Sequence, residues 1–174
     1  IGVASSFLQT QQLSPGCTVV VMIHNLLDSW TAVLALQALG LHTVCVKSWA
    51  VLDTLGLNDV AGIVTTAPET ADHPLKPYAS TGNRVIAIPG PAYDSADLPV
   101  APDVNGKTKT GGHILYTSGT TGNYKKLFFS ADLQRQRDAE RIASHPFNAD
   151  TIYHCANFGL WTGVGYKVPR TIWQ

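Results

Sequence analysis

The chain has 174 residues, enough for one domain with a substantial core. Its 12 basic and 12 acidic side chains cancel to a formal net charge of zero, which argues against duplex nucleic acid or an anionic membrane as a partner. Charged residues make up only 14% of the chain, against roughly 25% in typical soluble domains. Part of the surface is therefore expected to be covered by other protein.

The cysteine and histidine patterns predict neither a disulfide framework nor a metal site. Cys17, Cys45 and Cys155 are far apart and lie in apolar runs, as expected of free core thiols in the reducing cytoplasm. The six histidines show no metal-ligand spacing. No apolar run approaches the roughly 20 residues of a membrane helix. The chain starts without Met or a basic leader, so we expect it to be part of a longer protein.

Strand and helix patterns alternate through the first half of the chain. This alternation predicts an α/β fold, in which a mostly parallel sheet is flanked by helices in a three-layer αβα arrangement. Asp28 is the expected N-cap of the first helix, and Gly40 lies just past its end. The expected strands cover 17–24, 42–47, 61–67 and 84–90, with helices over 28–39 and 48–57 and a helix or loop up to Ser80.

The second half begins after a connection rich in proline and glycine, 89–112, which is the best candidate for an internal boundary. Ser130 is the expected cap of a helix that turns Leu133, Ala139, Ile142 and Ala143 inward and its arginines outward. Strands are expected over 113–118, 125–130 and 150–157.

The run "YTSGTTGNYKK", residues 116–126, lies at the carboxyl end of a predicted strand, where ligands bind in open parallel sheets. Its glycines let the backbone approach an anion, its hydroxyls add donors, and Lys125 or Lys126 can supply a positive charge. The run matches neither the Walker loop nor the dinucleotide fingerprint. On composition alone, a plain polar turn explains it as well as a phosphate site does.

The same run resembles the phosphate loop of the adenylate-forming superfamily, which comprises acyl-CoA synthetases, peptide-synthetase adenylation domains and luciferases. The family pattern is [YF]-T-S-G-[TS]-T-G-x-P-K-G; Tyr116 to Gly122 fit it, and Lys125 falls on the family lysine. The segments "LSPGCTVVVMIHN" and "DVAGIVTTA" resemble family strands in the same order, so the resemblance covers most of residues 13–174.

The resemblance has two departures. Tyr124 and Lys126 replace the family's proline and final glycine, which should change the stiffness of the loop's exit. Downstream, residues 157–160 fall on the family's P-L-F-H, so the usual histidine is absent. His154 lies too early to align with that histidine, and a plain strand residue is the simpler interpretation of it.

The resemblance implies that residues 1–174 form the N-terminal, partial AMP-binding domain of an ATP-dependent carboxylate-activating ligase. Such enzymes use ATP with Mg²⁺ to form an acyl-adenylate, and a CoA or carrier-protein thiol then takes the acyl group. The C-terminal lysine-bearing domain would be absent, so the chain is expected to be inactive without the remainder of the ligase or a partner subunit. The implied phosphate-binding residues, with Lys125 also catalytic, are Thr117, Ser118, Gly119, Thr120, Thr121, Gly122 and Lys125.

The identity of the acid is only weakly indicated. Thr120 at the variable loop position favours a CoA ligase over a peptide synthetase, and the apolar surroundings of Phe158 and Trp161 suit a hydrophobic or aromatic acid. Core packing is the simpler role for Trp161.

Two other interpretations stay open. The chain could be a non-catalytic nucleotide-binding or protein-interaction module, either a short paralogue or an excised fragment, and the low charge fraction favours this. It could also be an unrelated flavodoxin-like or Rossmann-like domain, because doubly wound folds host many functions.

Overall fold

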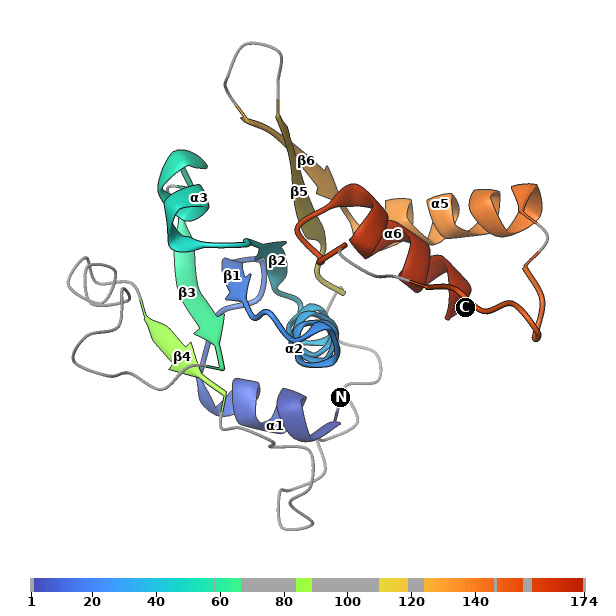
Figure 1. The fold of residues 1–174 in the computed structure, drawn as a ribbon. Helices are drawn as coiled ribbons and strands as arrows, with labels where there is room; N and C mark the ends of the chain where they lie inside the picture. Colours follow the sequence, from blue (N-terminus) through green and yellow to red (C-terminus); the bar gives the residue numbers. More distant parts are fainter. Residues whose placement is uncertain are drawn as a thin grey trace.

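The computed structural model describes residues 2–57, 59–66, 84–88, 110–118, 124–145, 147–154 and 158–173. Their strands form one six-stranded sheet in the order β4-β3-β1-β2-β5-β6 (Figure 1). All neighbouring pairs are parallel except β5 with β6, which is antiparallel. The expected mostly parallel sheet is therefore confirmed. The strands are β1 (Thr18–Met22), β2 (His42–Cys45), β3 (Val60–Thr65), β4 (Val85–Ala87), β5 (His113–Ser118) and β6 (Tyr124–Phe129).

Helices cover both faces of the sheet, and alternate residues of β1 pack against the helices on each face. Alternate side chains of a strand point to opposite faces. Val19 and Val21 join a core with α1 (Gly2–Thr10), α2 (Leu26–Ala38) and α6 (Gly163–Ile172). Val20 and Met22 join a second core with α3 (Trp49–Thr54). This arrangement gives the three layers that the strand and helix pattern predicts (Figure 1).

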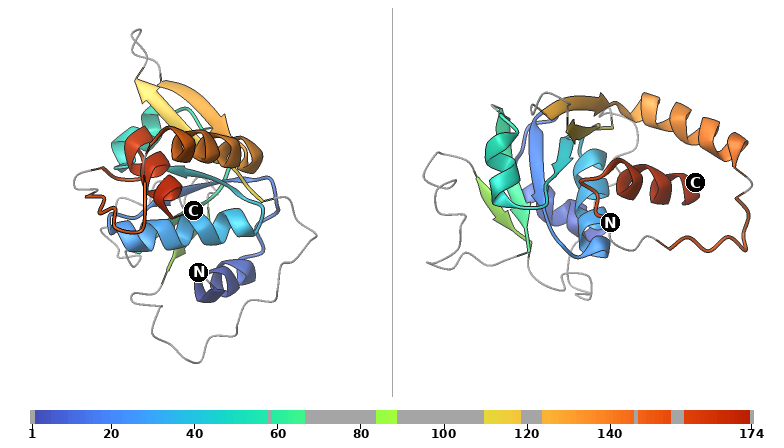
Figure 2. Two further views of the ribbon diagram at one scale, coloured as in Figure 1. Left: turned by 90° about the vertical axis from the view of Figure 1, so that its right-hand side faces the viewer. Right: turned by 45° about the horizontal axis from the view of Figure 1, so that its top comes forward.

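The second half of the chain adds a hairpin and two helices to this frame. β5 and β6 pair in register from His113 opposite Phe129 to Ser118 opposite Tyr124. The chain then enters α5 (Ala131–Ser144), which packs against α6 (Figure 2). Ser130 caps α5 as expected, because its side chain accepts a hydrogen bond from the Leu133 amide at 3.2 Å. None of the helices in the described part of the chain combines the length and apolar character needed to cross a membrane.

Three expectations about the elements are wrong. α2 is capped by Asn25, whose side chain accepts from the Asp28 amide at 3.1 Å, because the helix begins before Asp28. α5 buries Gln134 and Asp138 and leaves Ile142 exposed, since its contacts with α6 are polar. The segment expected as a strand over 150–157 has no strand pairing in its described part, up to His154.

Other expectations lie partly or wholly outside the described residues. This applies to the helix or loop up to Ser80, to most of the connection over 89–112 and to Cys155. Cys17 and Cys45 are free thiols, and Cys45 lies in the core. Gly40 follows α2 with a φ of 80°, a left-handed conformation that favours glycine and ends the helix as predicted. The helices α1 and α6 were not predicted.

Candidate functional site

The β5–β6 hairpin carries both ends of the candidate phosphate loop. β5 ends at Ser118 and β6 begins at Tyr124, so the loop joins two strands paired directly opposite each other. β5 runs parallel to β2, so its end at Ser118 lies at the carboxyl edge of the parallel strands, where the sequence places the site. Gly119, Thr120, Thr121 and Gly122 lie outside the described residues.

The base of the hairpin is tied to the sheet by Tyr116. Its hydroxyl donates a hydrogen bond of 2.7 Å to the Cys45 carbonyl at the end of β2. Its ring contacts the Tyr124 ring edge-on, with centroids 5.7 Å apart. Burial raises the pKa of Tyr116 above its ordinary value, with smaller contributions from Cys45 and Tyr124, so the phenol stays a hydrogen-bond donor at neutral pH. These contacts fix where the loop starts and ends.

The pairing register separates the two lysines that the sequence left as alternatives. Lys126 lies opposite Tyr116, and its ammonium donates to the Gly56 carbonyl beyond α3 at 2.6 Å. Lys125 lies opposite Thr117, and both residues are exposed. Within the described ranges, no carboxylate or hydrogen-bond acceptor engages Lys125. Among the described residues, only Lys126 of the two lysines is thus held by a hydrogen bond of its ammonium.

The two lysines also belong to different faces of the sheet. Residues paired across an antiparallel ladder share a face, and alternate residues of a strand share it too. Thr117 and Lys125 therefore lie on the same face as Leu115, which packs in the core formed with α2 and α6. Tyr116 and Lys126 lie on the face that packs against α3. A ligand held by Lys125 would approach from the α6 side.

A buried polar network beneath α6 holds the start of β5. The Gln37 amide donates to Thr43 Oγ1 and to the Tyr166 hydroxyl, both at 3.0 Å. Tyr166 in turn donates to Gln134 Oε1 at 2.7 Å. Burial raises the pKa of Tyr166 to about 12, which the Gln37 hydrogen bond partly offsets. The network joins α2, β2, α5 and α6 around one tyrosine.

His113, the first residue of β5, completes this network. Thr43 Oγ1 lies 2.8 Å from His113 Nδ1, and the imidazole stacks on the Tyr166 ring with centroids 3.7 Å apart. Its Nε2 makes no hydrogen bond of good geometry to the described residues. The nearby Leu160 backbone nevertheless raises the pKa of the ring. Burial outweighs this and lowers the pKa of His113 to about 3, with a further lowering by Arg170. The ring is neutral at physiological pH.

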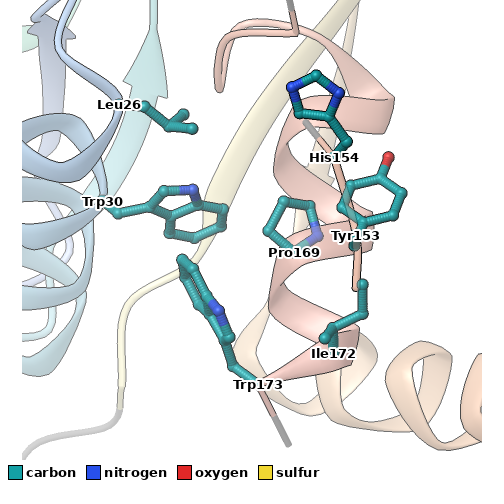
Figure 3. A pocket seen from close by; sticks show the side chains of 7 residues that line it. All are labelled: Leu26, Trp30, Tyr153, His154, Pro169, Ile172 and Trp173. Atoms are coloured by element: carbon teal, nitrogen blue, oxygen red, sulfur yellow. The ribbon is translucent and has the colours of Figure 1, made fainter. Parts of the chain in front are cut away.

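An apolar pocket of about 510 Å³ lies between the start of α2 and the end of α6 (Figure 3). Trp30 and Trp173 form one side, with ring centroids 4.9 Å apart in an edge-on arrangement. Tyr153 and His154 form another. Because α2 begins just past the end of β1, the Leu26 end of the pocket lies near the carboxyl end of that strand. Its remaining lining residues are Leu26, Pro169 and Ile172.

This pocket changes the roles expected of several residues. His154 lines it, whereas Phe158 and Trp161, the aromatic residues that the sequence associated with an acid, do not. Trp161 packs against the core and Phe158 is exposed. The aromatic walls were missed because Trp30 and Trp173 are 143 positions apart. Only the tertiary fold brings them together.

Comparison with known proteins shows what this fold is. No protein-family model matches the sequence, and no curated protein sequence matches it significantly. The structure resembles O-succinylbenzoate coenzyme A synthetase (MenE) of Bacillus subtilis in complex with AMP, with a TM-score of 0.72, 16% identity and coverage of 99% of this chain and 45% of that one. It also resembles ATP-bound MatB of Rhodopseudomonas palustris, with a TM-score of 0.75, 19% identity and coverage of 98% and 36%.

A third similar structure is an ATP-bound RpMatB–BxBclM chimera, with a TM-score of 0.77, 21% identity and coverage of 98% of this chain and 36% of that one. At these identities the matches show a shared fold. The chain thus has the fold of part of acyl-CoA synthetases such as MenE and MatB, in agreement with the resemblance seen in its loop. It spans less than half the length of the structures it matches.

Proposed function

We propose that the chain is the N-terminal portion of an ATP-dependent carboxylate-activating ligase of the acyl-CoA synthetase type. One observation carries the proposal. The run "TSGTTG" begins in the last two residues of β5, at the carboxyl edge of the parallel strands, and the exposed Lys125 of β6 lies opposite Thr117. The shared fold with ATP-bound MatB and with MenE in complex with ATP and magnesium ion supports it.

In this proposal the loop binds the β- and γ-phosphates of ATP. Amides and hydroxyls from Thr117 to Gly122 donate to the phosphate oxygens, and Lys125 supplies the full positive charge. A substrate carboxylate oxygen attacks the α-phosphorus, the bond to the bridging oxygen breaks, and pyrophosphate leaves with its charge held by the loop. A CoA or carrier-protein thiol would then displace AMP and take the acyl group. The loop contributes positioning and charge stabilisation.

The described residues fit Mg²⁺ only as an ion that enters with the nucleotide. Mg²⁺ prefers oxygen ligands and usually keeps several waters and phosphate oxygens. Across the ranges that the structure describes, no group of three or more His, Cys, Asp or Glu is placed to hold a metal. When bound, Mg²⁺ would neutralise phosphate charge. The chain's own contribution is the loop and Lys125.

Calorimetric binding of ATP and of pyrophosphate tests this proposal. Lys125→Ala should weaken binding by about 1.5 to 3 kcal/mol, because one charge-assisted contact is lost. Lys126→Ala is the matched control, since it removes the same charge from the adjacent position of the other face, where Lys126 is engaged by Gly56. Equal losses in both variants, or an unchanged affinity of Lys125→Ala, would contradict the assignment.

We also propose that the isolated chain does not catalyse the full reaction. It covers 45% of the similar MenE structure bound to AMP, and the resemblance assigns none of its 174 residues to the adenine segment or to the C-terminal lysine. Carboxylate-dependent exchange between ATP and pyrophosphate should therefore be absent with this chain alone. Robust exchange would refute this part of the proposal.

A second candidate function is a non-catalytic interaction module. It is favoured by large apolar side chains on the surface, since Leu27 is 70% exposed, Ile152 94% and Trp173 60%. Such a surface often marks contact with another protein. Self-association in analytical ultracentrifugation or binding of a hydrophobic dye is expected for the isolated chain. A dye-silent monomer would count against this function.

A further inference from the structure

The groove between α5 and α6 combines several positive charges in one hollow. Its volume is about 480 Å³. Arg137, Arg141 and Lys167 line it, together with Glu140, Ser144 and Phe129. Phe129 ends β6, four residues beyond Lys125, so the two lie about 13 Å apart along the strand. The groove is therefore separate from Lys125.

The charges around this groove do not balance. Arg137 pairs with Glu140 at 2.8 Å. The buried Asp138 carboxylate accepts from both Arg141 at 3.0 Å and Arg170 at 2.8 Å. Counting Lys167, this region thus has four cations and two carboxylates. The excess is local, because the whole chain has a formal net charge of zero.

Lys167 is the cation without a carboxylate. Its ammonium lies 4.7 Å from the centroid of the Phe129 ring, and no Asp or Glu in the described part of the chain pairs with it. Burial lowers its pKa, and repulsion by Arg141 and then Arg137 lowers it further. An anion in the groove would relieve this repulsion.

The other groups in the groove suit a phosphate. A guanidinium has five donors, and toward the described residues Arg141 uses one nitrogen, Nη1, for its bonds to Asp138 and Thr171, which leaves further donors on that part of the chain. Ser144 lines the groove as well, but its single hydroxyl proton is donated to the Arg141 carbonyl at 3.1 Å, so the donors for a phosphate come from the arginines and Lys167. Glu140 opposes an anion, and its pairing with Arg137 would have to yield to the ligand. A doubly charged anion is favoured over chloride by this arrangement.

We propose that the groove between α5 and α6 is a second anion site, which binds a phosphate group through Lys167, Arg141 and Arg137. The group is either free inorganic phosphate or the phosphate of a monoester. Lys167 provides a charge without a carboxylate partner among the described residues, and the two arginines provide directional donors, whereas Glu140 opposes the anion. The site is independent of the nucleotide site proposed above.

NMR titration of the Lys125→Ala chain with inorganic phosphate and with glycerol 1-phosphate tests the site without the loop lysine. We expect shifts of the amide signals around Arg141, Ser144 and Lys167, and a higher Lys167 pKa when the ligand is bound. Tighter binding of glycerol 1-phosphate would identify a phosphate monoester as the ligand of the groove. Tighter binding of inorganic phosphate would identify the free ion as the ligand. Absence of shifts at α5 and α6 with both ligands overturns the proposal.

Two further substitutions in that background make the test specific. Lys167→Gln should weaken binding at the groove at least about fivefold, the effect of losing one charged contact. Glu140→Gln should strengthen it, because Arg137 is released and a repulsive charge is removed. A gain of affinity cannot arise from loss of folding, so the second variant keeps the test decisive. Unchanged affinity in both variants overturns the site.

Discussion

The imidazole of His113 stacks on the phenol ring of Tyr166, with centroids 3.7 Å apart and an angle of 11° between the planes. His113 begins β5 and Tyr166 lies in α6, so this contact fastens a central strand to a helix more than 50 residues further along the chain. Both side chains are buried. The pair links the start of β5, the strand that leads to the candidate loop, to α6.

The first prediction concerns stability against pH. His113 has a folded-state pKa of about 3, below the ordinary 6.5, so the unfolded chain binds a proton between these values that the folded chain does not. Above pH 6.5 the ring is mostly neutral in both states and does not oppose folding. As the pH falls from 6.5 toward 3, protonation favours the unfolded chain, so the free energy of unfolding falls. Between pH 7 and pH 5 the free energy of unfolding should fall by about 2 kcal/mol on this account.

Urea unfolding at a series of pH values measures this dependence. His113→Gln keeps a hydrogen-bonding group near Thr43 but does not titrate, so its stability should depend less on pH over the same interval. The same slope in the variant and the parent chain would show that His113 is not the group responsible.

The second prediction concerns the Tyr166 hydroxyl. Tyr166→Phe keeps the ring that stacks on His113 but removes the bonds to Gln37 and Gln134, which leaves buried amide groups with fewer partners. The free energy of unfolding should fall by about 1 to 3 kcal/mol. Tyr153→Phe, at a residue 37% exposed, is the control and should stay within about 0.5 kcal/mol. Equal effects would contradict the importance of the network.

The third prediction concerns the buried carboxylate between α5 and α6. Asp138→Asn removes the charge that Arg141 and Arg170 share and should cost about 2 to 4 kcal/mol, less than for fully buried pairs because both arginines are partly exposed. The matched control in the same helix is Asp132→Asn, whose side chain is 88% exposed and pairs with the exposed Arg135. Thermal unfolding of both variants gives the comparison, and similar melting temperatures would refute it.

The fourth prediction concerns the approach of the chain to β5. A Cβ at Gly111 would lie 1.8 Å from the Leu41 carbonyl oxygen, so Gly111→Ala should displace backbone and destabilise the fold by more than about 3 kcal/mol. Gly163→Ala is the control, because nothing lies within 4 Å of its added Cβ at the start of α6. That variant should be neutral or gain up to about 1 kcal/mol. A soluble, equally stable Gly111→Ala chain would contradict the geometry.

Local patterns predicted much of this molecule. The β-branched run over β1 and the repeated strand and helix spacing gave the parallel sheet, because burial on both faces requires near-continuous apolar strands. Ser130 and Gly40 marked helix ends, because caps depend on the residue and its immediate neighbours. The candidate loop was also visible as a short motif. These features depend on contacts within a few residues.

The tertiary structure decided what depends on distant partners. α5 turns Gln134 and Asp138 inward because α6 supplies Tyr166 and Arg170, 32 residues further along the chain in each case. The placement of Lys125 and Lys126 on opposite faces of the sheet follows from strand register, since adjacent residues of a strand point to opposite faces. The aromatic pocket and the basic groove exist only after α6 docks. Sequence periodicity shows where an element buries a face, but the chemistry of that face depends on what packs against it.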